Sequence, residues 1–290
     1  MAKPDLSIVI VNWKVRALLE KCLQSIRWQQ DGINLEIFVV DNDSTDGTSE
    51  MLIIEFPEVI TIALPRNIGF AAACNLAIRQ SRADHILLLN PDTEIKASTL
   101  PRMLDYMRDN ASVGILGPKI LNTDGSLQPS VRRWPGFWSQ TLVLLKLRNL
   151  IPHHKILKHY HHGGFDYGRT QPVEQVMGAA MLIRRELVNK IGLLDENFFA
   201  WFEEVDYCLR AKRAGYQVMY LAEAEIVHQL GASFDQSHWL KKQWVFDQSL
   251  LHYFWKNKPS WQFFLLLPLI PVNLALTSLY ALFLQYKSNA

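Results

Sequence analysis

The chain alternates short apolar runs with longer amphipathic stretches up to residue 89, and this alternation restricts the folds that it can adopt. Short continuous apolar runs are typical of strands buried on both faces of a parallel sheet, and the stretches between them of helices. We expect strands over 6–12, 35–41, 59–64 and 85–89, with helices over 15–30, 47–55 and 69–81. This order predicts an open, Rossmann-like and mostly parallel sheet with right-handed crossover helices, which binds ligands beyond the carboxyl ends of its strands.

Beyond residue 89 the alternation is less regular. A strand over 113–118 is followed by a basic segment, about 130–170, that is rich in Trp and His and that we interpret as a loop-like insertion or lid. Further strands are expected over 176–183, 217–221 and 224–228, with helices that start at 185, end near 214 and cover about 235–255. The expected organisation is one α/β domain over 1–233 followed by a helical segment over 234–290.

Composition excludes several classes of protein. A formal net charge of +2 with 20% charged residues does not indicate a nucleic-acid-binding protein. The three cysteines, Cys22, Cys74 and Cys208, are far apart and show no C-x-x-C spacing, so neither a disulfide framework nor a zinc site is expected. The apolar run near the amino terminus is too short for a signal peptide. We therefore expect the bulk of the protein in a reducing cytosol.

Residues 261–284 are almost wholly apolar, and a helix of this length covers a hydrocarbon core of about 30 Å. Pro268 and Pro271 would kink such a helix, so three interpretations remain open: a spanning helix, a re-entrant or interfacial hairpin, and a soluble core helix. Lys256 and Lys258 precede the segment and would anchor its start on the cytoplasmic side. The sequence thus predicts association with the cytoplasmic face of a membrane.

The distribution of charge supports this prediction. No acidic residue lies between Asp124 and Asp166 or after Asp247, whereas both stretches contain Lys and Arg, so both suit an anionic surface. Residues 142–151 alternate basic and apolar side chains, as at a membrane interface, although a surface helix packed on the core is an alternative.

Polar side chains follow the predicted strands. The turn after Asp41 contains Asn, Asp and Ser, whose side chains can hydrogen-bond a base, a ribose or their own backbone. Helix N-capping is the alternative role for Ser44 or Asp46. Gly69 opens the third predicted helix, where backbone amides can face an anion. The candidates for binding a nucleotide at these strand ends are Asn12, Asp41, Asp43, Asn67 and Gly69.

The turn Asn90-Pro91-Asp92 follows the fourth predicted strand. Mg²⁺ or Mn²⁺ bound to a diphosphate needs only one or two protein carboxylates, because phosphate oxygens and water supply the other ligands. Asp92 is the candidate carboxylate, and Pro91 restricts the backbone that presents Asn90 and Asp92. This turn therefore predicts a divalent-metal and diphosphate site.

Three acidic residues, Glu203, Glu204 and Asp206, lie close together after the aromatic residues Phe199, Trp201 and Phe202. A carboxylate with a raised pKa can act as general base toward an acceptor hydroxyl, and aromatic rings offer a face to a sugar. A solvated helix start is the alternative. Which of the three acids is the base stays open.

These motifs, taken in order, resemble glycosyltransferase family 2. The matching segments are SIVIVNW, VVDNDSTDGT, RNIGFAAACN, LLLNPDTE, GAAMLIRRE, FFAWFEEVDYCLRAKRAGY and VHQLGAS. The resemblance is strongest to the rhamnosyltransferase-like branch, which builds cell-wall and O-antigen polysaccharides. It implies a GT-A fold and inverting transfer of a sugar from a nucleotide-sugar, with a dTDP- or UDP-sugar as donor, dTDP-rhamnose first among them. It also implies a lipid-linked or polysaccharide acceptor.

The resemblance also implies roles for individual residues. Asp41 would contact the base, Asn67 would lie near the nucleotide, and Asp92 would bind the metal at the family's D-x-D position, which here reads Asn-Pro-Asp. Glu204 falls at the position of the catalytic base. His228 ends a predicted strand and matches a histidine that can reach the metal or the pyrophosphate.

The sequence bears on three other classes of function. A nicotinamide dehydrogenase is excluded because no G-x-G-x-x-G follows the first strand. A nucleotidyltransferase would be expected to carry a Gly-rich basic loop near its amino terminus, which this chain lacks. A non-catalytic scaffold that binds a nucleotide-sugar or a polysaccharide remains as an alternative.

Overall fold

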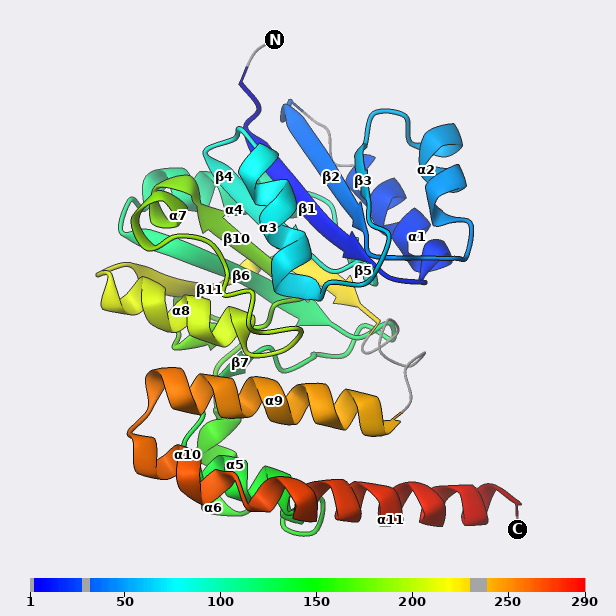
Figure 1. Cartoon of the computed structure of the whole chain (residues 1–290). Coiled ribbons are helices and arrows are strands. Elements are labelled where there is room, and N and C mark those ends of the chain that lie inside the picture. The colour runs from blue at the N-terminus through cyan, green and yellow to red at the C-terminus, as the bar shows by residue number, and fades with distance from the viewer. Residues whose placement is uncertain (1–2, 28–31, 230–238, 290) are drawn as a thin grey trace.

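The computed structural model describes residues 3–27, 32–229 and 239–289. A mixed sheet with strand order β3-β2-β1-β4-β10-β6-β11-β5 forms its centre, and β8 pairs with β11 (Figure 1). The strands of this sheet are β1 (Leu6–Asn12), β2 (Leu35–Asp41), β3 (Ile60–Ala63), β4 (His85–Leu89), β5 (Thr93–Ile95), β6 (Val113–Leu121), β8 (Gln171–Pro172), β10 (Ala180–Arg184) and β11 (Gln217–His228). A second small sheet pairs β7 (Val131–Arg132) with β9 (Gln175–Val176).

Helices cover both faces of the sheet and form a further layer beside it (Figure 1). They are α1 (Arg16–Arg27), α2 (Thr48–Glu55), α3 (Phe70–Gln80), α4 (Thr99–Asp109), α5 (Phe137–Leu144), the 3-10 turn η1 (Leu147–Asn149), α6 (Lys155–Tyr160), α7 (Arg185–Ile191), α8 (Glu203–Arg213), α9 (Trp239–Asn257), α10 (Ser260–Leu266) and α11 (Leu269–Asn289).

Strand β1 shows why the sheet is buried on both faces. Successive side chains of a strand point to opposite faces. Ile8 and Ile10 belong to the core cluster that includes Leu19 of α1 and Leu100 of α4. Val9 and Val11 lie on the other face, in the cluster formed with α3 and α8. Every residue of β1 is therefore buried, with helices on both faces, which confirms the expected α/β fold.

The amino-terminal half agrees closely with the prediction. Strands β1, β2 and β4 have the predicted bounds, and β3 and helices α2 and α3 end within a residue of theirs. β3, β2, β1 and β4 pair in parallel, so the carboxyl ends of β1, β2 and β4 lie at one edge of the sheet. The predicted residues 28–30 of the first helix lie outside the described residues.

Beyond residue 89 the structure differs from the prediction in four places. The strand expected over 176–183 is broken into β9 and β10, and β10 runs antiparallel to both of its neighbours. The strands expected over 217–221 and 224–228 are one strand, β11, with a β-bulge between Leu221 and Glu225. The segment expected to be loop-like contains α5 and α6, and β5 and α4 were not predicted at all.

A third core cluster joins the C-terminal helices to the sheet domain. Phe202 and Val205 of α8 pack with Leu250 and Phe254 of α9, and the same cluster extends to Ile270 of α11. Helices α5, α10 and α11 lie together on the side of α9 that faces away from the sheet (Figure 1). The predicted helix over 235–255 is observed as α9, and its residues 235–238 lie outside the described residues.

The apolar tail is not one straight helix. It consists of α10 and α11, which are separated at Leu267 and Pro268, because proline lacks an amide donor and its ring disturbs the preceding turn. By length and composition the stretch Ser260–Leu282 is long and apolar enough to cross a membrane, although α11 packs here against α9 and α5.

Candidate active site

The ends of β1 and β2 place two of the predicted residues side by side. Asn12 and Asp41 are paired in the parallel register, and both are almost fully buried. Asn12 Nδ2 donates to Ser44 Oγ and to Thr48 Oγ1, each at 3.1 Å. Asp41 accepts from the Ser44 amide at 3.3 Å and from Ser49 Oγ at 3.0 Å. Both side chains therefore shape the turn that follows β2.

Asn42 connects this turn to the next loop, and the sequence did not single it out. Its Nδ2 donates to Asn67 Oδ1 at 3.0 Å and to the Gly69 carbonyl at 3.3 Å, while its Oδ1 accepts from the Ile68 amide at 2.9 Å. Asn67 Oδ1 also accepts from the Gly69 amide at 3.0 Å. The predicted residues Asp41, Asn67 and Gly69 are thus brought together through Asn42, a polar residue in a turn after a strand. Asp43, next in this turn, has a left-handed backbone (φ 73°).

Gly69 has a position that no other residue can occupy without rearrangement. Its φ is 89°, and a Cβ atom here would lie 2.6 Å from the Phe199 carbonyl oxygen. The same carbonyl accepts a hydrogen bond from the Phe70 amide at 2.7 Å. The start of α3 therefore contacts the segment that leads to Glu203 and Glu204.

The Asn90-Pro91-Asp92 turn lies at the end of β4. The Asn90 amide donates to the Ala179 carbonyl at 2.9 Å, and Thr93 Oγ1 donates to the Asn90 carbonyl at 2.7 Å. β5 then pairs with β11 so that Thr93 lies opposite His228. As a result, His228 Nε2 lies 3.3 Å from Asp92 Oδ1, and the structure brings together the two residues predicted to bind a metal.

The hydrogen bonds around His228 define what its ring presents to Asp92. Gln128 Nε2 donates to Asn122 Oδ1 at 2.8 Å and to the His228 carbonyl at 3.2 Å, so Gln128 Oε1 faces His228 Nδ1, 2.7 Å away. An amide oxygen only accepts, so Nδ1 carries a proton. In a neutral ring Nε2 then presents a lone pair to Asp92 Oδ1. Gln128 and Asn122 were not predicted.

This arrangement fits a bound cation. Asp92 Oδ1 is buried and has no hydrogen-bond partner, and His228 Nε2 lies 3.3 Å from it. Metal-bound histidines commonly donate their other ring N–H to an oxygen acceptor, as His228 does to Gln128. Within the described parts of the chain no group of three or more His, Cys, Asp or Glu side chains is placed to hold a metal. Asp92 and His228 would therefore supply two ligands, and a diphosphate and water the others.

Glu203 and Glu204 start helix α8. Burial raises the pKa of Glu203 well above its usual range, and the neighbouring Glu204 raises it further. Burial also raises the pKa of Glu204, while backbone amides and the guanidinium of Arg132 oppose this increase. Oε2 of each carboxyl group is buried without a hydrogen-bond partner. A carboxyl group with a raised pKa is suited to general-base catalysis near neutral pH.

The backbone before α8 is strained. Trp201 and Phe202 have left-handed conformations, with φ of 65° and 68°, which cost about 1–2 kcal/mol for each non-glycine residue. Packing of both rings against Phe246 of α9 and a hydrogen bond of 2.8 Å from Ser249 Oγ to the Ala200 carbonyl hold this conformation. Strain of this kind is frequent at functional sites.

Glu204 lies next to the Asn90 turn. A Cβ atom on Gly178 would lie 3.5 Å from Glu204 Cβ, and the following residue, Ala179, accepts the Asn90 amide. Arg132 of β7 is close enough to lower the pKa of Glu204, and it is exposed. Glu204, Asn90 and the pair of Asp92 and His228 thus occupy the same end of the sheet.

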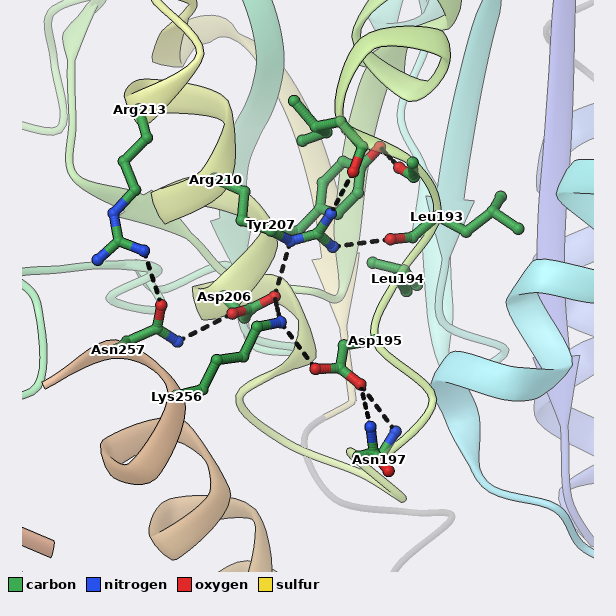
Figure 2. A network of polar contacts seen from close by, with 12 residues as sticks. Leu193, Leu194, Asp195, Asn197, Asp206, Tyr207, Arg210, Arg213, Lys256 and Asn257 are labelled. Atoms are coloured by element: carbon green, nitrogen blue, oxygen red, sulfur yellow. Dashed lines mark hydrogen bonds and ion pairs between the residues drawn. The ribbon is translucent and has the colours of Figure 1, made fainter. Parts of the chain in front are cut away.

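The carboxylate of Asp206, in the same first turn of α8, has a different set of contacts. Its carboxylate is fully buried and accepts from Arg210 Nε, Lys256 Nζ and Asn257 Nδ2, each at 2.9 Å (Figure 2). Lys256 also donates to Asp195 at 2.7 Å. The structure therefore places the Asp206 carboxylate in a network that joins α8 to α9.

A mixed α/β sheet that gathers a buried acid–histidine pair and a buried glutamate at one edge is the arrangement expected of a GT-A glycosyltransferase. The solved structure of a mannosyltransferase from Pyrobaculum calidifontis, in complex with GDP-Man and Mn²⁺, has the same fold: its TM-score is 0.59 at 16% identity, with 100% of this chain and 81% of that chain covered. The chain belongs to glycosyl transferase family 2, whose model matches residues 7–192. This confirms the resemblance noted in the sequence.

Curated relatives point to the same branch. An N-acetylglucosaminyl-diphospho-decaprenol L-rhamnosyltransferase of Mycobacterium tuberculosis is 27% identical over 234 residues, which cover 77% of this chain and 75% of the relative. A dTDP-rhamnosyl transferase of Shigella flexneri is 26% identical over 201 residues, which cover 68% of this chain and 61% of that relative. The protein is therefore similar to rhamnosyltransferases of cell-surface glycan synthesis.

Proposed function

We propose that this family 2 glycosyltransferase transfers rhamnose from dTDP-rhamnose to a lipid-linked acceptor, with inversion at the anomeric carbon and with Mg²⁺ or Mn²⁺. The observation that carries the proposal is the position of Glu204, a half-buried residue with a buried Oε2 and a raised pKa, near the pair of Asp92 and His228. Support for the donor and the acceptor comes from the names of the two relatives. A UDP-sugar is the second candidate donor.

Each residue has a defined task in this proposal. The turn built by Asn12, Asp41 and Asn42 and the loop with Asn67 and Gly69 hold the nucleoside. Asp92 and His228 would hold the cation, which would neutralise charge on the diphosphate. Asn90 is fixed to Ala179 and keeps the turn in place.

Glu204 is the proposed general base. Its carboxylate takes the proton of the acceptor hydroxyl while the hydroxyl oxygen forms a bond to the anomeric carbon. The bond between that carbon and the phosphate oxygen breaks on the opposite face, its electron pair leaves with the nucleoside diphosphate, and the configuration inverts. Glu203 is more deeply buried, and the neighbouring Glu204 adds to the increase in its pKa. Asp206 is held by Arg210, Lys256 and Asn257.

A donor panel tests the proposal. The full chain is incubated with dTDP-rhamnose and with UDP-sugars, with Mn²⁺ or with a chelator, and release of the nucleoside diphosphate is measured with and without a lipid-linked acceptor. We expect metal-dependent turnover with dTDP-rhamnose, and its loss in Glu204→Gln and Asp92→Ala. Donor binding without any turnover would instead indicate a non-catalytic scaffold, and full activity of both variants would contradict the assigned roles.

The proposed acceptor implies that the enzyme works at a membrane. A lipid-linked acceptor is confined to a bilayer, and a cytosolic nucleotide-sugar reaches it only from the cytoplasmic side. We therefore propose the cytoplasmic face of the cell membrane as the location of the protein, with the C-terminal apolar helices as its contact. Fractionation of cells into soluble and membrane material tests this location.

A further inference from the structure

The C-terminal helices pack against the basic segment of about residues 130–170, here called the middle segment, and both expose large apolar side chains. Phe137 of α5 lies against Trp261 of α10, with ring centroids 5.4 Å apart, and α5 also packs against α11. Large apolar side chains of both segments remain exposed, and the following six define what we call the apolar face: Trp138, Leu150, Trp261, Phe264, Leu265 and Leu279. Leu150 is 77% exposed and Trp138 66%. Large apolar side chains that gather on a surface in this way mark a site of contact with another molecule or with a membrane.

The charges around this face have one sign. Arg148, Lys155 and Lys158 are exposed on η1 and α6, which adjoin α5. No acidic residue lies between Asp124 and Asp166 or after Asp247 in the sequence, so α5, α6, α10 and α11 carry no negative side chain. Apolar area bordered by Lys and Arg complements a bilayer that contains anionic lipids, because the headgroups attract the cations while the hydrocarbon takes up the apolar side chains.

The packing of α11 shows how it meets such a bilayer. Asn273 of α11 is fully buried and donates to both carboxylate oxygens of Asp247 on α9, at 2.8 and 3.0 Å. Gln243 of α9 donates to the same carboxylate at 2.8 Å. A helix that crossed the hydrocarbon core would have to remove Asn273 from these partners, and an unpaired amide there costs several kcal/mol. In the structure α11 lies alongside α9, where Asn273 keeps these partners (Figure 1).

Two open apolar grooves lie along the same layer. One, of about 490 Å³, lies between α9 and α10 and is lined by Trp255 and Phe264 among others, and the second, of about 260 Å³, lies between α9 and α11 and includes Trp244 and Leu267. Such grooves can take up hydrocarbon chains. Trp is also the side chain favoured at the boundary between headgroups and hydrocarbon.

We infer that the apolar face is an in-plane docking surface for an anionic lipid bilayer, formed jointly by the middle segment and by α10 and α11, and that α10 and α11 do not span the membrane. This inference extends the lipid-linked acceptor of the proposed function by naming the surface and the lipid chemistry that bring the enzyme to it. The basic segment expected to act as a lid is then part of the membrane contact.

Vesicle co-sedimentation of the full chain tests the inference. We expect binding to vesicles of phosphatidylcholine with phosphatidylglycerol, weaker binding to phosphatidylcholine alone, and release from the mixed vesicles by high salt or alkaline carbonate. Each of Arg148→Ser, Lys155→Ser and Lys158→Ser should weaken partitioning into the mixed vesicles about fivefold, which corresponds to about 1 kcal/mol per charge. Lys21→Ser, on an exposed position of α1, is the matched control and should have no effect.

The apolar contribution is tested by Phe264→Glu and Leu265→Glu. Each should reduce partitioning by more than about tenfold, because the variant removes an exposed apolar side chain that would enter the bilayer and adds a charge of the wrong sign. Ile53 and Ile54 of α2 are similarly exposed but lie outside the apolar face, so Ile53→Glu and Ile54→Glu serve as controls that should bind vesicles normally.

Three outcomes would overturn the inference. They are retention in the membrane after carbonate extraction, which is typical of a spanning helix; vesicle binding that Phe264→Glu leaves intact; and a stable dimer through the apolar face that does not bind vesicles. Hydrolysis of the donor in detergent-free solution separates this inference from the proposed function. Phe264→Glu should still hydrolyse the donor but should no longer bind vesicles. A wild-type chain that binds vesicles but does not hydrolyse the donor would contradict the proposed function and leave this inference intact.

Discussion

His228 Nε2 lies 3.3 Å from Asp92 Oδ1 at the edge of the sheet, although the two residues are far apart in the sequence. Pairing of β5 with β11 creates this proximity, because it sets Thr93 opposite His228. The contact is not a hydrogen bond, since Asp92 Oδ1 has no partner. A buried carboxylate and an imidazole that face each other in this way can supply two ligands to a cation.

Gln128 orients the His228 ring, so its removal should weaken the metal site without touching the donor. In Gln128→Leu we expect Mn²⁺-dependent donor binding to fall about 10- to 100-fold, as is usual when the partner of a metal-bound histidine is lost. Isothermal titration with donor in the presence of Mn²⁺ measures this. Binding measured with a chelator should equal that of the wild type, and an equal loss in both conditions would show that Gln128 acts on the fold instead.

The acid limb of the pH–rate profile should report Glu204. Burial raises the pKa of Glu204, so kcat/KM should increase with pH until this carboxyl group is ionised. Arg132 opposes the increase in pKa, and Arg132→Ala should therefore shift the acid limb to higher pH. Arg133 pairs with Glu174, so Arg133→Ala is the control, and the acid limb of its pH–rate profile should not shift. An unchanged profile in Arg132→Ala would exclude Glu204 as the group that titrates.

Glu203 should make the protein less stable as the pH rises. Its pKa is raised in the folded state, so the folded chain holds a proton that the unfolded chain releases at lower pH. Stability is thus complete below the usual pKa of a glutamate and decreases with pH until the folded-state pKa is reached. Glu203→Gln should raise Tm, and the gain should grow between acidic and neutral pH. Glu186→Gln, at an exposed position, should show no such trend, and a pH-independent gain for Glu203→Gln would contradict the raised pKa.

Lys256 should matter for stability more than a surface lysine does. It contacts Asp195 at 2.7 Å and Asp206 at 2.9 Å, and Asp206 is fully buried (Figure 2). Burial acts to raise the pKa of Asp195, but hydrogen bonds from Lys256 and His252 outweigh it and hold this pKa well below its usual range. We expect Lys256→Met to lower the free energy of unfolding by about 1–3 kcal/mol, because a buried carboxylate loses a charged partner.

Lys3, whose pair with Asp84 is exposed on both sides, provides the comparison. Lys3→Met should cost less than about 1 kcal/mol, as is usual for surface ion pairs. Urea denaturation of both variants measures the difference. Equal losses would show that the network between α8 and α9 contributes no more than a surface contact.

Local sequence patterns predicted most of the parallel half of the sheet. The strands β1, β2 and β4 are mostly apolar, and each has a polar residue at or directly after its end. Both the strands and the positions of Asn12, Asp41 and Asn90 could therefore be inferred. Helix α4 carried a usable signal that was overlooked: Leu100, Met103, Leu104 and Met107 recur at helical spacing and are all buried.

Other features depend on contacts between distant segments and leave no local pattern. Gln128 reaches His228 across 100 positions of sequence, and nothing around Gln128 marks it. Asp206 shares a short acidic cluster with Glu204, and only the packing of α9 determines that it binds Lys256 and Asn257. The break between β9 and β10 likewise follows from tertiary pairing with β7 and β4.

The pairing of Asp92 with His228 as a cation and diphosphate site is tested most directly by donor binding with and without metal. Isothermal titration would compare the wild type with Asp92→Asn, using the donor selected by the panel, in Mn²⁺ and in a chelator. We expect the wild type to bind the donor much more tightly in Mn²⁺, and Asp92→Asn to bind it equally weakly in both. Tight, metal-dependent binding that Asp92→Asn retains in full would contradict the assignment of Asp92.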